Sequence, residues 1–85
     1  MEIIFQPQAL EDLEFWKKSG NEKVLKKIRE LLENIQQTPF EGLGKPEALK
    51  HQLTGKWPRR ITDEHHLVYK VENNTITVYQ VRFHY

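Results

Sequence analysis

The chain has 85 residues, no cysteine and a formal net charge of +1. A chain of this length buries only about 60–65 % of the surface that its unfolded form exposes, which predicts a single domain, residues 1–85, with one modest core. The lack of cysteine excludes disulfides and thiolate zinc sites and is typical of proteins in a reducing compartment. The chain begins without a basic leader or a long apolar stretch, so we expect a cytoplasmic protein rather than a secreted or membrane protein.

The first half of the chain predicts a strand and two helices. The apolar run at residues 2–5 indicates a strand that ends before Pro7, a residue suited to the first turn of a helix. Apolar residues then recur at helical spacing until Ser19-Gly20, and a second helix begins after Asn21, a good N-cap. Thr38-Pro39 ends this second helix, whose apolar stripe consists of Val24, Ile28, Leu31 and Ile35.

The second half predicts a sheet. Residues 38–58 contain most of the glycines and prolines and therefore indicate a loop, with a helical turn near residues 48–53. Three strands are predicted, at residues 59–62, 66–72 and 75–85. Because the connections between them are short, we expect these strands to pair antiparallel. The element order is β-α-α-β-β-β, and we expect an α+β fold in which both N-terminal helices pack on one face of an antiparallel C-terminal sheet.

Positive charge is concentrated in the second half. Residues 1–44 carry six basic and eight acidic side chains, whereas residues 45–85 carry seven and four. Within residues 45–60 a single acid, Glu47, is accompanied by five cations: Lys45, Lys50, Lys56, Arg59 and Arg60. Such a run favours a polyanionic ligand, although a solvated basic loop is the common alternative.

Strand alternation separates the candidate site residues from the core. If Ile61 is a core residue, Arg59 shares its face and Arg60 projects from the other, so Arg60 is the better candidate for phosphate contact. One row of the last strand changes from apolar to polar towards its end, which predicts that Arg82 and His84 line an exposed surface or cleft. A mobile chain end without a role is the alternative for His84.

The remaining titratable residues favour acid/base chemistry over metal chemistry. Glu47 follows Pro46 and lies between two lysines that would hold it ionised, so it is a candidate general base, with a surface glutamate as the alternative. His65 and His66 are adjacent, and no histidine or carboxylate spacing matches a zinc or iron motif. The sequence also has no glycine-rich phosphate loop after a strand and no serine nucleophile elbow. We expect neither a metal nor a cofactor.

Several motifs that together span the chain point to one family. They are residues 38–50, residues 53–62, Glu64-His65, Leu67-Val68-Tyr69 and the terminal His84-Tyr85. In this order and at this chain length they resemble the YoeB-like toxins (Txe/YoeB family) of the RelE superfamily, which belong to type II toxin-antitoxin systems. The resemblance implies a RelE-like fold and ribosome-dependent, metal-free cleavage of translated mRNA in the A site.

The resemblance also implies roles for individual residues. Glu47 matches the general base that activates a ribose 2′-hydroxyl, and His84 matches the general acid that protonates the departing 5′-oxygen. Lys50 and Arg60 match positions near the scissile phosphate, and Tyr85 matches a terminal tyrosine that orients the substrate. Because RNA supplies its own nucleophile, a base, an acid and fixed cations are sufficient for this chemistry.

One position departs from the family pattern. The residue before Leu67-Val68-Tyr69 is usually arginine in these toxins, and here it is His66. An unperturbed histidine has a pKa of about 6.5, so it is only partly cationic near neutral pH, and it lacks the bidentate fork of a guanidinium. We therefore expect His66 to act at the catalytic centre, with activity that is weaker and more dependent on pH.

Arg59 and Arg82 complete the predicted substrate-binding residues.

The resemblance further implies a YefM-like antitoxin, contact with the ribosome and mRNA, a homodimer, and operator DNA bound through the antitoxin complex. Two other functions remain open. A toxin fold that has lost catalysis would act only as antitoxin partner and transcriptional co-repressor. A relative that poisons DNA gyrase would use the same fold, but it would have no need of the set formed by Glu47, Lys50, Arg60 and His84.

Overall fold

The computed structural model describes residues 1–44 and 55–83. The elements in chain order are β1 (Glu2–Phe5), α1 (Pro7–Ser19), α2 (Glu22–Gln37), β2 (Trp57–Arg60), β3 (His66–Glu72) and β4 (Thr75–Gln80). This order confirms the prediction from the sequence. The helical turn predicted near residues 48–53 lies outside the described residues.

Local signals in the sequence set the ends of both helices. Pro7 opens α1, and Gly20 ends it in the left-handed conformation, with a φ of 69° and its N–H donating to the Lys17 carbonyl. The Asn21 side chain caps α2 by accepting a hydrogen bond from the Val24 N–H at 3.2 Å. Neither α1 nor α2 is long and apolar enough to cross a membrane, and no other helix occurs in residues 1–44 and 55–83.

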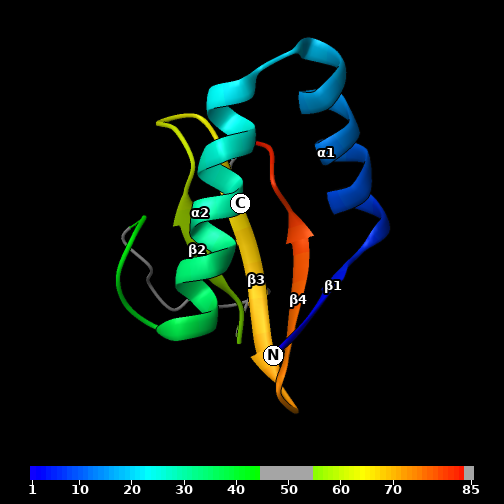
Figure 1. Cartoon of the computed structure of the whole chain (residues 1–85). Helices are drawn as coiled ribbons and strands as arrows, with labels where there is room; N and C mark the ends of the chain where they lie inside the picture. The colour runs from blue at the N-terminus through cyan, green and yellow to red at the C-terminus, as the bar shows by residue number, and fades with distance from the viewer. Residues whose placement is uncertain (45–54, 84–85) are drawn as a thin grey trace.

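The strands form one mixed sheet in the order β1-β4-β3-β2 (Figure 1). The pairs β2–β3 and β3–β4 are antiparallel, as the short connections predicted. Asn73 and Asn74 form the turn between β3 and β4 with φ values of 53° and 56°, which asparagine tolerates better than most residues. The N-terminal strand β1 pairs with β4 in parallel, a contact that no local signal in the sequence indicated.

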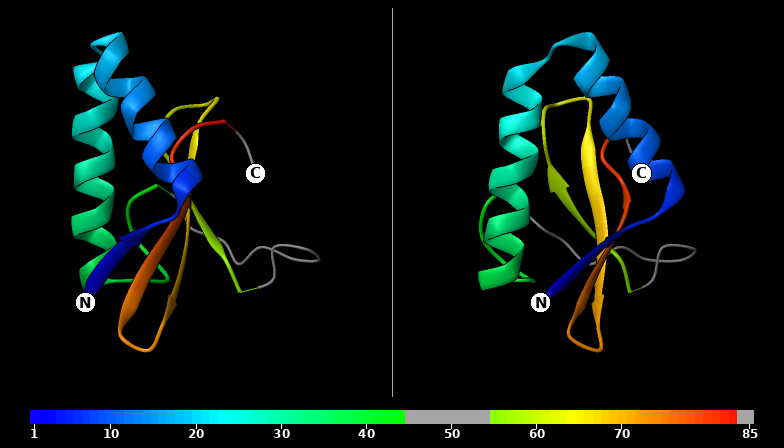
Figure 2. Two further views of the ribbon diagram at one scale, coloured as in Figure 1. Left: turned by 90° about the vertical axis from the view of Figure 1, so that its right-hand side faces the viewer. Right: turned by 45° about the vertical axis from the view of Figure 1, so that its right-hand side comes forward.

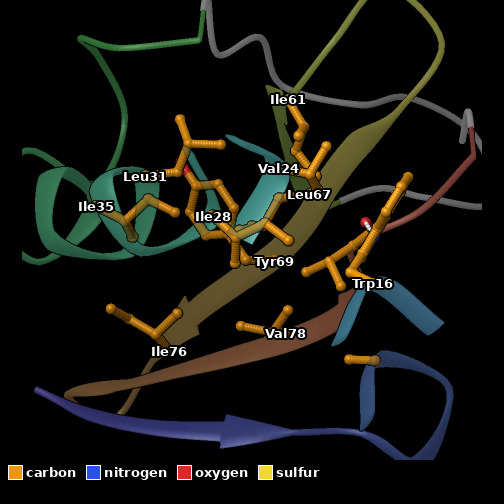
Figure 3. Close-up of a cluster of buried hydrophobic side chains, with 12 residues drawn as sticks. Trp16, Val24, Ile28, Leu31, Ile35, Ile61, Leu67, Tyr69, Ile76 and Val78 are labelled. Carbon is orange, nitrogen blue, oxygen red and sulfur yellow. Dashed lines mark hydrogen bonds between the residues drawn. The ribbon is translucent and has the colours of Figure 1, made fainter. Parts of the chain in front are cut away.

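Both helices lie on the same face of the sheet, which gives the predicted two-layer α+β architecture (Figure 2). The stripe of α2 formed by Val24, Ile28, Leu31 and Ile35 faces the sheet and is buried (Figure 3). It packs with buried side chains of β3 and β4: Leu67, Tyr69, Ile76 and Val78. Burial of each large aliphatic side chain contributes about 1.5–3 kcal/mol, so this layer is the main source of stability.

The last strand is shorter than predicted. It ends at Gln80, and residues 81–83 follow as a bent segment rather than as a continued strand. In a regular strand Val78 and Val81 would point to opposite faces, so only one of them could be buried in the core. Both are fully buried. The pairing with β3 shifts register between Val68 and Tyr69, and this irregularity turns the following residues of the chain. The prediction of one straight row to the chain end was therefore wrong. Likewise β2 covers Trp57–Arg60 rather than residues 59–62.

Candidate active site

Arg60 and His66 form a direct cross-strand pair between β2 and β3. Opposite residues of an antiparallel pair project from the same face, here the face away from the helices. The Arg60 side chain is 47 % exposed, and its guanidinium lies 4.0 Å from the exposed carboxylate of Asp63, a pair of little energetic weight. His66 is buried, with only 9 % of its surface exposed. The structure thus confirms that Arg60 projects away from Ile61 and the core.

Two chain segments are hydrogen-bonded to this Arg60–His66 pair from opposite sides. The Arg60 N–H donates to the Gly44 carbonyl at 2.8 Å, and the His66 N–H donates to the Phe83 carbonyl at 2.9 Å. Gly44 has a φ of 84°, and a Cβ there would lie 2.9 Å from the Arg60 nitrogen, so only glycine fits without rearrangement. The described parts of the loop and of the C-terminal segment therefore meet at the predicted cationic pair.

Four predicted site residues lie outside the described residues: Glu47, Lys50, His84 and Tyr85. Their neighbours in sequence are nevertheless informative. Gly44 precedes the segment with Glu47 and Lys50, and Phe83 precedes His84. Both neighbours are bonded to the Arg60–His66 pair.

Further cations lie near this surface of the sheet. Lys70 lies on the same face of β3 as His66, four residues further along the strand. Its ammonium is 3.4 Å from the Glu72 carboxylate. The Lys56 ammonium sits 3.9 Å from the centre of the Tyr79 ring, within the range of a cation–π contact. A Cβ on Gly55 would be 3.6 Å from the Lys70 side chain, so the chain re-enters the described structure beside Lys70. These lysines extend the positive surface beyond Arg60.

Arg59 must be removed from the predicted substrate-binding set. Its side chain is fully buried, and all five N–H donors of the guanidinium have protein acceptors. Nε donates to the Tyr69 hydroxyl at 3.1 Å, and the terminal nitrogens donate to the Asn34 side chain at 2.5 Å and to backbone carbonyls. These carbonyls belong to Thr38, Glu41 and Leu43, at 2.6–2.9 Å. Arg59 therefore holds the loop at residues 38–44 and presents no donor to a substrate.

Asn34 and Tyr69 complete the hydrogen-bond network of Arg59. The Asn34 Oδ1 also accepts from the Leu43 N–H at 3.0 Å, and the Tyr69 hydroxyl donates to the Pro39 carbonyl. Burial raises the pKa of Tyr69 above its usual range, although the adjacent Arg59 counteracts part of this effect. The phenol is therefore protonated at neutral pH and remains a donor. The network fixes the loop that brings Gly44 to Arg60.

Arg82 lines a surface pocket with Gln8, Asp12, Gln80 and Phe83, which agrees with its predicted place at a surface or cleft. Its guanidinium carbon lies 3.3 Å from the centre of the Phe15 ring and 4.3 Å from that of Phe83. These are cation–π distances, and they tie the C-terminal segment to α1. Contact between Arg82 and a substrate remains a prediction.

The C-terminal segment is anchored by Asp12, Trp16 and His65, to none of which the sequence assigned this role. The Val81 N–H donates to the buried Asp12 carboxylate at 3.0 Å, and the Trp16 indole N–H donates to the Val81 carbonyl at 2.8 Å. His65 Nδ1 accepts from the Phe83 N–H at 2.8 Å. For Asp12 the sequence signal was an acid beside the apolar helix positions Leu13 and Trp16, and His65 stood out only as part of the Glu64-His65 motif. Figure 2 shows the segment next to the β2–β3 connection.

Within residues 1–44 and 55–83, no cluster of three or more histidine, aspartate or glutamate side chains could hold a metal ion. The part of the site that the structure describes consists of the Arg60–His66 pair, the lysines near it, and two anchored chain segments. This arrangement suits an anionic ligand on the face of the sheet that the helices leave open.

Residues 5–85 match the model of a protein family described as the YoeB-like toxin of bacterial type II toxin-antitoxin systems. Toxin YoeB of Escherichia coli K12 is 44 % identical over 85 residues, with full coverage of both chains. A YoeB dimer from Staphylococcus aureus superimposes with a TM-score of 0.91 at 45 % identity, covering 100 % of this chain and 98 % of the other. A YoeB–YefM complex from the same organism gives a TM-score of 0.90 at 46 % identity, with the same coverage.

Proposed function

The chain belongs to the YoeB-like toxins of bacterial type II toxin-antitoxin systems, and we propose that it is a single-domain, cytoplasmic endoribonuclease. It would cleave translated mRNA in the ribosomal A site and so inhibit translation. The observation that carries the proposal is the convergence of the Gly44 and Phe83 backbones on the Arg60–His66 pair. The general acid and base of the proposed reaction belong to the segments that follow these two residues in sequence.

The proposed reaction is an intramolecular transesterification at phosphorus, in which the ribose 2′-oxygen replaces the 5′-oxygen of the next nucleotide. Glu47 removes the proton from the ribose 2′-hydroxyl, whose oxygen forms a bond to the adjacent phosphorus. The bond from phosphorus to the 5′-oxygen breaks, and His84 donates a proton to that oxygen. Cations near the scissile phosphate, Arg60, His66 and Lys50, stabilise the charge that accumulates on the phosphoryl oxygens. No metal or cofactor takes part in this scheme.

Two further residues are assigned to substrate binding. Tyr85 would orient the RNA at the end of the chain, and Arg82 would contribute positive charge from the pocket beside α1. Arg60 is the cation with the strongest structural support, because it is exposed on the open face of the sheet and its backbone is fixed on both sides. An exposed guanidinium in a fixed backbone can bind a phosphate in bidentate fashion with little loss of freedom.

The partners are proposed from the solved relatives. One Staphylococcus aureus structure is a YoeB dimer and another is a YoeB–YefM complex. We infer a homodimer and a YefM-like antitoxin for this chain as well, with operator DNA bound through the antitoxin complex. A disordered antitoxin segment that folds on binding would keep the nuclease silent.

A second candidate function follows from His66. Because the family position usually holds arginine, this chain could be a weakened nuclease that acts mainly as antitoxin partner and transcriptional co-repressor. Incubation of the purified protein with ribosomes translating a defined message discriminates between the two. The proposed function requires cleavage that depends on the ribosome, whereas intact message together with operator binding by the antitoxin complex would establish the alternative.

Replacement of His66 by arginine is expected to raise the cleavage rate about tenfold at pH 7.5, since a permanent bidentate charge replaces one that is present only part of the time. The gain should shrink as the pH falls towards 6 and the imidazole becomes protonated. Rates are measured against pH on one ribosome-bound message. Arg60→His, the reverse change at the paired position, should lower the rate at pH 7.5 and lose less at pH 6.

The same pH series also contains the results that would contradict this role. If His66 transfers a proton, arginine would abolish activity, because a guanidinium does not exchange a proton near neutrality. If the two rates are equal at every pH, His66 is neither a cation nor a proton carrier in the reaction.

A further inference from the structure

Phe83 adopts a backbone conformation that is unusual for a residue with a side chain. Its φ is +65°, in the left-handed region that a Cβ disfavours. Burial of the phenyl ring in the core does not account for this conformation, because Phe83 is 55 % exposed. Strained backbone of this kind persists only where surrounding contacts hold it, and it occurs often at functional sites.

The contacts that hold Phe83 are made to its backbone on both sides. Its N–H donates to His65 Nδ1 at 2.8 Å. Its carbonyl accepts from the His66 N–H at 2.9 Å and from the Gln80 side-chain amide at 3.3 Å. The residue is therefore clamped to the start of β3 and to the end of β4, although it belongs to neither strand.

The imidazole of His65 is itself held in place. Its ring meets the Trp16 ring edge-on, with 4.9 Å between centroids and an interplanar angle of 87°. The backbone of His65 is fixed as well. Its backbone N–H donates to the Thr62 hydroxyl at 3.1 Å, and its carbonyl accepts from the Ile61 N–H at 2.9 Å. To accept a hydrogen bond, Nδ1 must be unprotonated, so the ring proton of the neutral imidazole is on Nε2.

We propose that His65 is a positioning residue of the reaction. Through Nδ1 it holds Phe83 in the left-handed conformation and so fixes the backbone from which the chain continues to His84. The general acid needs such control because it must lie within hydrogen-bond reach of the leaving oxygen. This inference rests on the proposed function and adds a residue that does not touch the RNA.

Three substitutions separate the hydrogen bond from other contributions of the side chain. His65→Phe keeps a flat ring against Trp16 but removes the acceptor. His65→Asn retains an oxygen that can reach the place of Nδ1, whereas His65→Gln, of similar polarity, carries its amide one bond further out. The wild type and the three variants are compared by thermal unfolding, by kcat and KM on a ribosome-bound message, and by amide exchange at Phe83.

Loss of one hydrogen bond should raise the exchange rate of the Phe83 amide about tenfold in His65→Phe and His65→Gln. The same two variants should lose about tenfold in kcat with KM within twofold, because Arg60 and His66 stay in place while the acid is misplaced. His65→Asn should recover both quantities to within about threefold of the wild type. The Gln and Asn variants should both be fully folded at the assay temperature, so that a difference in kcat cannot arise from unfolding.

Three other results would contradict the positioning role of His65 or the proposed function. Faster Phe83 exchange with unchanged kcat would overturn the positioning role and leave the proposed function intact. Unchanged Phe83 exchange in His65→Phe would show that His65 does not hold this backbone. No cleavage by the wild-type protein would overturn the proposed function and, with it, the role of His65 in the reaction.

Discussion

Replacement of Arg59 by lysine is expected to lower the free energy of unfolding by about 3 kcal/mol, although the positive charge is kept. The fully buried Arg59 side chain supplies five donors, and an ammonium supplies only three, without the planar fork that reaches opposite sides of the site. At least two hydrogen bonds to partly buried acceptors would be lost, and a hydrogen bond to a charged group contributes about 1.5–3 kcal/mol. For a chain with a total stability of about 5–15 kcal/mol, this is a severe change.

The measurement is urea unfolding of the purified protein, supported by thermal unfolding, in which a domain of this size loses roughly 4–8 °C per kcal/mol. Arg60→Lys is the matched control, because it makes the same change at the next residue, whose side chain is 47 % exposed. We expect the control to stay within about 0.5 kcal/mol of the wild type. Equal stabilities of the two variants would mean that the Arg59 network does not hold the loop at residues 38–44.

Replacement of His84 by alanine is expected to slow cleavage by a factor on the order of 10² or more while the fold survives. A positioned general acid contributes about 10²- to 10⁴-fold, and the departing 5′-oxygen is a poor leaving group without a proton. The fold should survive because the core residues that the structure describes form a cluster without position 84. Single-turnover rates on a ribosome-bound message measure the loss, and thermal unfolding checks the fold.

Lys23→Ala is a suitable control for His84→Ala, because Lys23 is exposed on α2 and has no role in the proposed reaction. Its rate should equal that of the wild type within about twofold. If His84→Ala cleaves as fast as this control, His84 is not the general acid, and the alternative of a chain end without a role would be correct.

The sequence predicted most of the fold because its signals are local. Pro7, Gly20 and Asn21 mark helix ends, and the apolar stripe of α2 and the Asn73-Asn74 turn follow from short-range periodicity and turn chemistry. The parallel pairing of β1 with β4 joins segments about seventy residues apart, and such contacts have no local signal. The early end of β4 depends on a register shift against β3, which alternation alone cannot reveal.

The site was predictable only where a residue projects from a regular strand. Alternation separated Arg60 from Arg59 correctly, but it could not show that Arg59 is saturated by carbonyls of a loop sixteen to twenty-one residues earlier. The contacts of Asp12 and Trp16 with Val81 also span most of the chain. A buried polar residue and a solvated one look alike in a sequence, because the partners that permit burial come from distant segments.

The chemical groups at the cleaved RNA ends show whether the ribose 2′-hydroxyl or water is the nucleophile. The purified protein is incubated with ribosomes that translate a message of known sequence, and the ends of both fragments are identified. Attack by the 2′-hydroxyl with His84 as general acid predicts a 2′,3′-cyclic phosphate or 3′-phosphate on the upstream fragment and a 5′-hydroxyl on the downstream fragment. A 3′-hydroxyl and a 5′-phosphate would contradict the mechanism, because they require water rather than the ribose as the nucleophile.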